Sequence, residues 1–313
     1  MVNRLARDSA AERAALLAGL RAKPASIPPK YFYDSLGSAL FGAICELPEY
    51  YPTRTERAIF DANRVDIANA IGTGAQFIDL GAGDGAKAEA WLPFLVPSRY
   101  LAVDIAADAL ERTLARLSGR FPDVAMVGMV TDFSAGLEMS TELAEGPVTF
   151  FYPGSSIGNF TPDEAIEFLR PIETACQARP GSGLLIGVDT KKDKARLDAA
   201  YDDALGVTAS FNRNVLNHVN RVLGCDFDPA AFTHRGFYAE AQGRIEMHLE
   251  ARSPQAVNLD GETRVFAAGE RIHTENSYKY APDEFETLLA FAGFSTVRRW
   301  QDSRGDFAVF WAG

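Results

Sequence analysis

The sequence predicts an α/β fold with a doubly wound, largely parallel sheet and a second, smaller α+β domain. Two observations carry this prediction. Between residues 75 and 190, short apolar segments alternate with helix-like segments, as in βαβ units whose strands are covered on both faces. After about residue 190, a charged helical stretch gives way to segments with period-two alternation, which is typical of antiparallel strands.

The elements of the first domain follow from the positions of these segments. Strands are expected at 75–80, 99–105, 124–132, 148–152 and 183–190. Helices are expected at 85–95, 107–118 and 162–178. A helix from Pro282, which we expect Asp283 to cap, and a hairpin around residues 302–306 return to complete the first sheet.

The second domain combines the N-terminal segment with the region after the fifth strand. Its expected elements are a helix at 8–22, two short helices within 31–60, a helical stretch at 191–224 and strands within 243–259 and 263–280. A helical pattern from 57 to 71 lies at the start of the first domain. The predicted boundaries are 57–191 with 281–313 for a cofactor domain, and 1–56 with 192–280 for a substrate domain.

Composition excludes several classes of protein. The 313 residues carry a net charge of −11, so no basic surface is available overall to neutralise nucleic-acid phosphates. Cys45, Cys176 and Cys225 are an odd number and lack the paired spacing of a zinc site, which fits reduced thiols. No apolar run resembles a signal peptide or a membrane span. We expect a cytoplasmic monomer that acts on a small molecule and binds neither metal, membrane nor nucleic acid.

A glycine-rich turn follows the first strand in the stretch "DLGAGDGAK". Gly81, Gly83 and Gly85 let the backbone turn sharply and let a ligand lie against it, although a tight βα turn alone explains such glycines. Asp104 ends the next strand, where a carboxylate can accept hydrogen bonds from both hydroxyls of a ribose. Its alternative role is the N-cap of the following helix.

The residues after the third strand discriminate between cofactors. Asp132 and Phe133 suit an adenine, because a polar group can take the exocyclic amine while the ring packs on the base. A nicotinamide cofactor would require a G-x-G-x-x-G turn, which "GAGDGA" lacks. The pattern favours S-adenosylmethionine as the cofactor, and the antiparallel terminal hairpin is typical of methyltransferases that use it.

Longer motifs give the chain a specific resemblance. "YFYDSLGSALFGAICELPEYYPTRTE", "PGSSIGNFTP", "AYDDALGVTASFNRNVL" and "RIEMHLEAR" resemble the L-histidine Nα-methyltransferases of ergothioneine biosynthesis, from about residue 28 to 311. This resemblance implies a class I (Rossmann-like) methyltransferase domain and a small substrate domain. It also implies three methyl transfers to the α-amine of histidine, which give hercynine.

The resemblance also implies roles for particular residues. Those implied to contact the cofactor are Gly81, Lys87, Asp104, Asp132 and Phe133. Those implied to bind the substrate are Tyr50, Gly154, Asn159, Tyr201, Met247, Glu275 and Ser277, with Asn159 and Tyr201 on the carboxylate and Glu275 and Ser277 on the imidazole. Tyr33 and Tyr50 are the implied catalytic residues near the amine. The cofactor loop departs from the family form at "DGA", which leaves its detailed contacts open.

The chemistry requires alignment more than a reactive side chain. The neutral amine must lie in line with the methyl group, and an aromatic wall would favour the growing positive charge. Tyr31, Tyr33, Phe41, Tyr50 and Tyr51 are candidates for this wall, or for plain packing. Three alternatives stay open: a same-fold methyltransferase for another amino acid such as tryptophan, a catalytically silent cofactor-binding subunit, and an NAD-dependent oxidoreductase.

Overall fold

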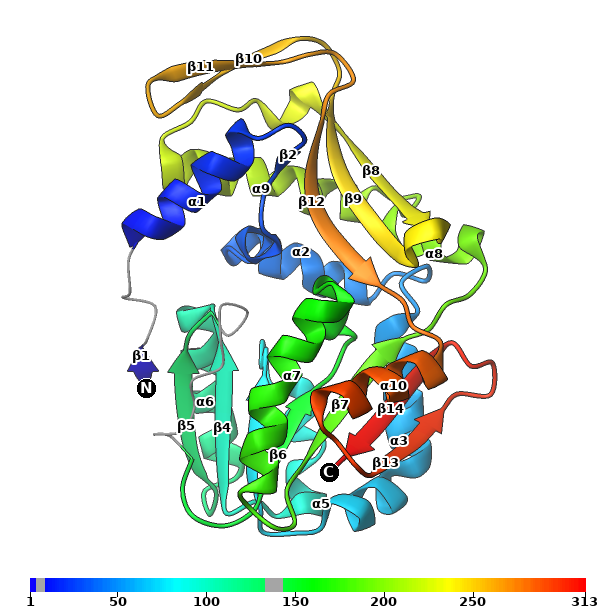
Figure 1. Cartoon of the computed structure of the whole chain (residues 1–313). Coiled ribbons are helices and arrows are strands. Elements are labelled where there is room, and N and C mark those ends of the chain that lie inside the picture. Colours follow the sequence, from blue (N-terminus) through cyan, green and yellow to red (C-terminus); the bar gives the residue numbers. More distant parts are fainter. Residues whose placement is uncertain (4–8, 133–142) are drawn as a thin grey trace. The chain divides into compact units, whose positions relative to one another are not determined.

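The chain forms two compact units. The computed structural model describes residues 1–3, 9–132 and 143–313. The first unit comprises Met1–Ala6, Pro52–Lys191 and Tyr280–Gly313, and the second comprises Arg7–Tyr51 and Lys192–Lys279. Figure 1 shows the elements of both units in the order of the chain.

An eight-stranded sheet forms the centre of the first unit, in the order β1-β5-β4-β3-β6-β7-β14-β13. Its strands are β1 (Val2–Asn3), β3 (Gln76–Leu80), β4 (Arg99–Asp104), β5 (Ala125–Val130), β6 (Val148–Tyr152), β7 (Gly183–Asp189), β13 (Val297–Gln301) and β14 (Phe307–Ala312). The strands from β1 to β7 run parallel, whereas β14 inserts antiparallel between β7 and β13. The expected return of the terminal hairpin to the first sheet is therefore confirmed.

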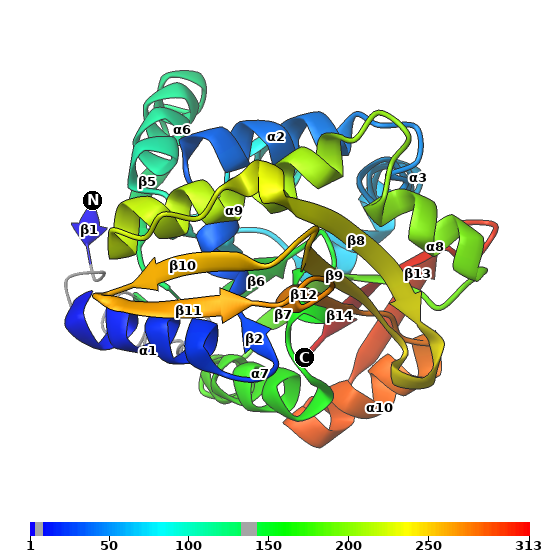
Figure 2. The same cartoon turned by 90° about the horizontal axis from the view of Figure 1, so that it is seen from above.

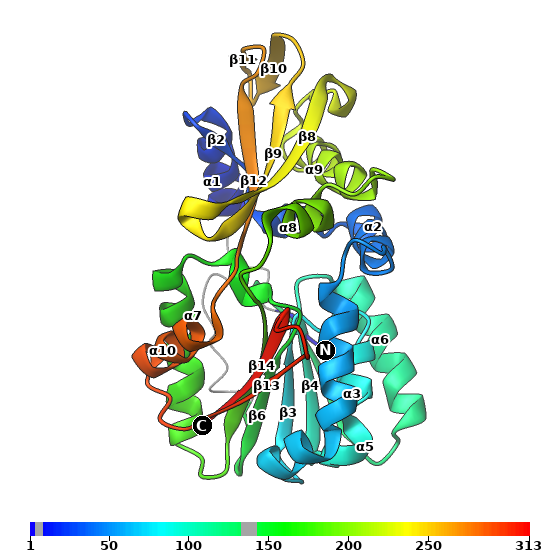
Figure 3. The same ribbon diagram turned by 90° about the vertical axis from the view of Figure 1, so that its right-hand side faces the viewer.

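Helices cover both faces of this sheet, with α7 and α10 on one face and α3, α5 and α6 on the other (Figure 3). The bounds are α3 (Pro52–Ile71), α4 (Ala86–Glu89), α5 (Leu92–Leu95), α6 (Ala107–Arg120), η3 (Ser156–Asn159), α7 (Pro162–Gln177) and α10 (Pro282–Ala292). Burial on both faces explains why every residue of β3, β6 and β7 is buried and why these strands are mostly apolar rather than alternating.

Three expectations for this unit were wrong in detail. The helix expected at 85–95 is broken at Ala90 and Trp91, where the indole turns into the core. The helix expected from 57 begins at Pro52, because proline suits a first helical position. The start of α10 is not capped by Asp283: the Glu284 carboxylate accepts from the Ala281 N–H, and Asp283 pairs with Arg299.

The second unit is built around a four-stranded sheet in the order β2-β12-β9-β8, which Figure 2 shows beside α9. The strands of this unit are β2 (Ala25–Ser26), β8 (Phe232–Ala239), β9 (Arg244–Ala251) and β12 (Arg271–Tyr278), with a separate hairpin of β10 (Gln255–Leu259) and β11 (Glu262–Phe266). Its helices are α1 (Ser9–Arg21), η1 (Pro29–Phe32), α2 (Ser35–Cys45), α8 (Lys194–Tyr201), α9 (Val207–Leu223), η4 (Pro229–Ala231) and η5 (Glu240–Gln242).

Strand β8 is the longest element that the sequence analysis missed. Its inward positions include a polar residue, His234, and a glycine, Gly236, which hide the alternation. The His234 ring is satisfied inside the core by the Asn212 side chain at 2.8 Å and the Tyr201 carbonyl at 2.8 Å. A tertiary hydrogen-bond network thus places an imidazole where local pattern predicts an apolar side chain.

The unit boundaries differ from the predicted ones at the N-terminal segment. Of the described residues, 1–3 and 52–56 belong to the first unit rather than the second, and so does Tyr280. The described part of the N-terminus, β1, pairs with β5, and α3 packs on β14. These long-range contacts are not visible in the local sequence pattern.

Candidate active site

The glycine turn lies at the carboxyl end of β3. Gly81, Gly83 and Gly85 have φ values of 76°, 54° and 67°. Residues with a Cβ atom rarely adopt such positive values. A Cβ on Gly85 would lie 2.6 Å from Cγ2 of Thr113, whereas one on Gly83 would meet nothing within 4 Å. The backbone near Gly83 is therefore open to a ligand, while Gly85 is required by packing against α6.

Asp104, at the end of β4, anchors this turn. Its Oδ2 accepts from the Gly83 N–H at 2.8 Å, and its Oδ1 accepts from the Ala106 N–H at 2.9 Å. It is not the N-cap of α6, which is Ala106. Each carboxylate oxygen retains a further lone pair, so ribose binding by Asp104 stays a prediction that this geometry permits. Asp132 follows β5 at the same edge of the sheet, and Phe133 lies outside the described residues.

The loop after β6 is the second half of the site in this unit. Strand β3 has β4 on one side and β6 on the other, so the chain reverses its winding direction between β3 and β6. In doubly wound sheets, ligands bind at such a switch point, outside the carboxyl ends of the strands. Gly154, with φ 79°, and Asn159, at the end of η3, both lie on this loop.

Glu56 links the two loops and was not predicted. Its side chain is 1% exposed, and its carboxylate accepts from Nζ of Lys87 at 2.6 Å and from the Gly154 N–H at 2.7 Å. A Cβ on Gly187 would lie 2.0 Å from Oε1 of Glu56, so β7 needs a glycine there. Glu56 shares the buried face of α3 with Ile59 and Phe60, and a lone carboxylate at an apolar helix position was the signal that could have identified it.

In the second unit, a β-bulge decides which way Glu275 points. Strand β12 pairs His273 with His248 and Glu275 with Met247, so Thr274 is an extra residue on β12. On a regular strand, Glu275 would face the same side as His273. The bulge turns Glu275 and Ser277 to the other face of the sheet. On that face their cross-strand neighbours are the buried residues Met247 and Ile245.

A polar cluster forms on this face of the sheet. The Tyr201 and Ser277 hydroxyl oxygens lie 3.0 Å apart, and Nζ of Lys279 donates to both at 2.8 Å. Tyr201, Ser277 and Lys279 are all buried. Burial raises the pKa of Glu275 to about 7, and the positive charge of Lys279 works in the opposite direction. A carboxyl group that titrates near neutrality is typical of functional sites.

Aromatic rings adjoin this cluster. The Tyr50 ring centroid lies 6.0 Å from that of Tyr201, and Phe41 lies 6.3 Å from Tyr50 and 5.9 Å from Tyr33. Burial raises the pKa of Tyr50 well above its usual value, with contributions from Tyr201, Cys45, Glu275 and Tyr33. Tyr50 therefore stays a neutral phenol at physiological pH, which suits a proton relay or a hydrogen-bond donor better than a fixed base.

Two other candidates for the aromatic wall have different contacts. The Tyr31 ring packs edge-on against His218 at 5.6 Å, and the Tyr51 hydroxyl accepts from Nζ of Lys192 at 2.8 Å. The contacts of Tyr31 and Tyr51 support the packing alternative. Those of Tyr33, Phe41 and Tyr50 support the wall.

A family model described as a histidine-specific, S-adenosylmethionine-dependent methyltransferase matches residues 12–313. The chain belongs to this family. Two curated relatives named histidine N-alpha-methyltransferase, from Mycolicibacterium smegmatis and Mycobacterium tuberculosis, are 42% and 40% identical over 99% of this chain and 97% of theirs. A 4-dimethylallyltryptophan N-methyltransferase, easF of Claviceps purpurea, is 26% identical over 94% of this chain and 92% of its own.

Family membership confirms several predictions from the sequence. The class I methyltransferase fold and the dependence on S-adenosylmethionine are confirmed, and the oxidoreductase alternative was wrong. The structure fits this cofactor. At the carboxyl ends of the strands lie the open backbone at Gly83, the Asp104 carboxylate, and the Lys87 ammonium with its partner, the Glu56 carboxylate. The individual cofactor and substrate contacts of these residues stay predictions.

The structure also places the predicted residues in two groups. Gly81, Lys87, Asp104, Asp132, Gly154 and Asn159 belong to the first unit, and Tyr33, Tyr50, Tyr201, Met247, Glu275 and Ser277 belong to the second. Within the described residues, no cluster of three histidine, cysteine or acidic side chains could hold a metal ion. A search of the same residues found no helix with the length and apolar character of a membrane span.

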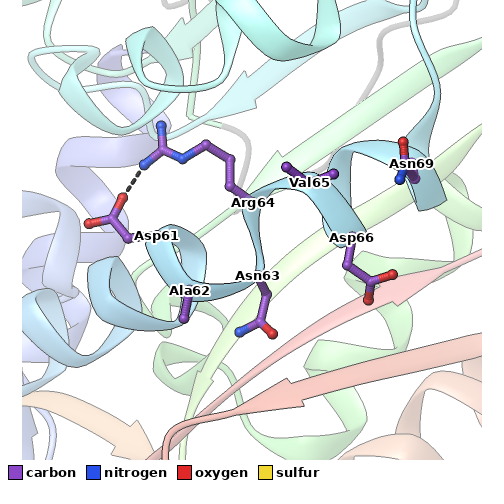
Figure 4. A pocket seen from close by; sticks show the side chains of 7 residues that line it. All are labelled: Asp61, Ala62, Asn63, Arg64, Val65, Asp66 and Asn69. Atoms are coloured by element: carbon purple, nitrogen blue, oxygen red, sulfur yellow. Dashed lines mark hydrogen bonds and ion pairs between the residues drawn. The ribbon is translucent and has the colours of Figure 1, made fainter.

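Figure 4 shows a surface hollow of the first unit. It runs along α3 and has a volume of about 400 Å³. Its walls are formed by consecutive turns of one helix, where Arg64 pairs with Asp61. None of the predicted site residues lines it, so we assign it no role.

Proposed function

We propose that this protein transfers methyl groups from S-adenosylmethionine to the α-amine of L-histidine, three times, to give Nα,Nα,Nα-trimethylhistidine. The observation that carries the proposal is the polar cluster of the second unit. A carboxylate, Glu275, lies on the same face of β12 as a hydroxyl, Ser277, beside apolar and aromatic side chains. Such an arrangement fits a flat ring with two nitrogen atoms.

The roles of the residues follow from the chemistry. When bound, S-adenosylmethionine supplies a methyl group on a sulfonium, and the neutral amine displaces the thioether to form the new N–C bond. Asp104 and the glycine turn hold the ribose end of the cofactor, and Lys87 faces its carboxylate. Asn159 and Tyr201 bind the carboxylate of histidine, whereas Glu275 accepts a ring N–H and Met247 packs against the ring.

The aromatic side chains serve the amine. Tyr33 and Tyr50 lie on either side of Phe41 in one run of ring contacts. Each transfer leaves a positive charge on the nitrogen, which becomes permanent only with the third methyl group, and the faces of aromatic rings stabilise this charge. The proton released before each of the transfers passes through the tyrosine hydroxyls and water to solvent. After the third transfer the nitrogen has no lone pair, so the reaction ends there.

The experiment is a methylation assay on the purified chain. With L-histidine and S-adenosylmethionine, mass spectrometry is expected to show a product heavier by three methyl groups. Glu275→Ala is expected to weaken histidine binding at least tenfold, or about 1.4 kcal/mol, while cofactor affinity stays unchanged. Equal loss of both affinities would contradict the assignment of Glu275 to the imidazole.

A second candidate function is N-methylation of another amino acid. The 26% identity to a 4-dimethylallyltryptophan N-methyltransferase supports this second candidate. Competing L-histidine with L-tryptophan and 4-dimethylallyltryptophan in one assay separates the two. Turnover of an indole substrate with histidine inert would replace the first proposal, and cofactor binding without any turnover would favour the silent-subunit alternative.

A further inference from the structure

Asn212 is a buried amide inside the second unit, and the proposed function does not use it. It lies on α9 and is 0% exposed. Its Oδ1 accepts from the Thr274 hydroxyl on β12 at 2.9 Å. Its Nδ2 lies 3.1 Å from the His248 carbonyl oxygen on β9 and 2.8 Å from Nδ1 of His234 on β8. One side chain therefore connects three strands of the sheet, and its polar atoms are paired as burial requires.

The partners of this amide fix the tautomer of His234. The His248 carbonyl can only accept, so the part of the Asn212 amide that faces it is the NH2 group. The same NH2 group lies within hydrogen-bond distance of Nδ1 of His234, which must therefore be the unprotonated ring nitrogen. The proton of the neutral ring is then on Nε2, which donates to the Tyr201 carbonyl at 2.8 Å. Burial lowers the pKa of His234, and the neutral ring is the form that this network requires.

The bond from His234 holds the end of α8. The last four carbonyls of a helix have no partner within it, and the Tyr201 carbonyl is one of them. The end of α8 also lies close to β8, since a Cβ on Gly236 would be 2.4 Å from the Tyr201 carbonyl oxygen. The Nε2–H group of His234 thus fixes the residue whose hydroxyl oxygen lies 3.0 Å from that of Ser277.

The other end of the network is the bulge of β12. At a bulge two residues face one residue of the neighbouring strand, and here Thr274 and Glu275 face Met247. The Thr274 hydroxyl has two acceptors within reach, Oδ1 of Asn212 at 2.9 Å and the Met247 carbonyl at 3.0 Å. Thr274 is 1% exposed. Because Glu275 is the next residue, the direction of its side chain depends on how Thr274 is held.

We propose that Asn212 is a positioning residue for substrate binding, which joins the bulge of β12 to the end of α8 so that Glu275 and Tyr201 keep one fixed spacing. The inference rests on the proposed function and deepens it, because these two residues serve the imidazole and the carboxylate of the same histidine. Asn212 touches no substrate atom in this scheme; it acts through Thr274 and His234.

The test measures histidine affinity by calorimetry, with S-adenosylhomocysteine present so that no turnover occurs. Thr274→Val keeps the branched shape and removes the hydroxyl, whereas Thr274→Ser keeps the hydroxyl. Without the hydrogen bond the bulge adopts other conformations, and the affinity falls with the fraction of molecules that remain competent to bind. We expect roughly three- to tenfold weaker histidine binding in Thr274→Val, the range of one lost hydrogen bond, and less than about twofold in Thr274→Ser.

The bond from His234 to the Tyr201 carbonyl is tested in the same way. His234→Leu removes both ring nitrogens, whereas His234→Gln retains an N–H donor of similar reach. We expect roughly three- to tenfold weaker binding in the leucine variant and a smaller loss in the glutamine variant. Asn212→Ala breaks both connections. Adding Thr274→Val to it is expected to change the affinity by less than about twofold, because residues of one network are not additive.

The possible outcomes are distinct. Wild-type histidine affinity in Thr274→Val and His234→Leu, or an equal loss in Thr274→Val and Thr274→Ser, would overturn the inference and leave Asn212 a residue of the fold alone. An equal loss of S-adenosylhomocysteine affinity, measured in parallel, would also overturn it. If Asn212→Ala does not fold, the two Thr274 variants decide.

The wild-type titration separates this inference from the proposed function. If the wild type binds no histidine, the proposed function fails and the inference fails with it. If the wild type binds histidine and the variants bind it equally well, only the inference fails.

Discussion

Replacing Glu56 tests whether the segments that follow β3 and β6 depend on one buried carboxylate. Glu56→Ala removes the acceptor of the Gly154 N–H and the ionic partner of Lys87. An orphaned buried N–H costs about 1–3 kcal/mol. Because the Lys87 side chain is 38% exposed, it can turn to water, and its lost pairing adds only about 0–1 kcal/mol. The expected decrease in the free energy of unfolding is therefore about 1–4 kcal/mol.

The matched control is Glu56→Gln. Its amide oxygen can still accept from the Gly154 N–H while the charge is lost, so it is expected to cost less stability than the alanine variant. Denaturant unfolding of both variants and of the wild type gives the stabilities, and calorimetry gives the S-adenosylmethionine affinities, which we expect to fall in both. The reasoning fails if Glu56→Ala unfolds within about 0.5 kcal/mol of the wild type, the range of an ordinary surface substitution.

Two further predictions concern buried groups of the first unit. Gly85→Ala is expected to destabilise by about 1–3 kcal/mol more than Gly83→Ala, since both have positive φ but only the Gly85 methyl would lie 2.6 Å from Thr113; equal unfolding midpoints would refute this. Burial raises the pKa of Asp79, which hydrogen-bonds to Tyr100, to about 7. The folded state therefore holds a proton that the unfolded chain releases near pH 4, so this group's contribution to stability is lost as pH rises from about 4 to about 7. Relative to the wild type, Asp79→Asn should gain stability across that interval and stay level above it; a difference that is independent of pH would contradict the burial argument.

The organisation of the first unit was predictable because its signals are local. Apolar runs such as 75–80 and 148–152 are fully buried strands, and periodic segments such as 162–178 are helices. The glycine turn followed from the need for positive φ at Gly81, Gly83 and Gly85. Spacing along the chain then placed Asp104 at the same edge of the sheet, because parallel strands end together.

The predictions that were wrong concern elements whose bounds depend on contacts between residues far apart in the sequence. The break at Ala90 and Trp91 depends on where the indole finds the core, and β8 depends on a hydrogen-bond network that buries His234. The start of α3 was placed five residues late because aromatic and proline residues conceal the helical pattern before 57. Propensity is a weak signal at such points, and tertiary contacts override it.

For the candidate site, the sequence by itself determined the residue types, the motifs and the family. Only the tertiary structure decided how they combine: that Glu56 bonds to both Lys87 and Gly154, and that Lys279 bonds to Tyr201 and Ser277. The bulge at Thr274 is the clearest case, because one extra residue reverses the face on which every later side chain of β12 lies. A bulge depends on how a strand pairs with its neighbour, and no local stretch of the sequence predicts that pairing.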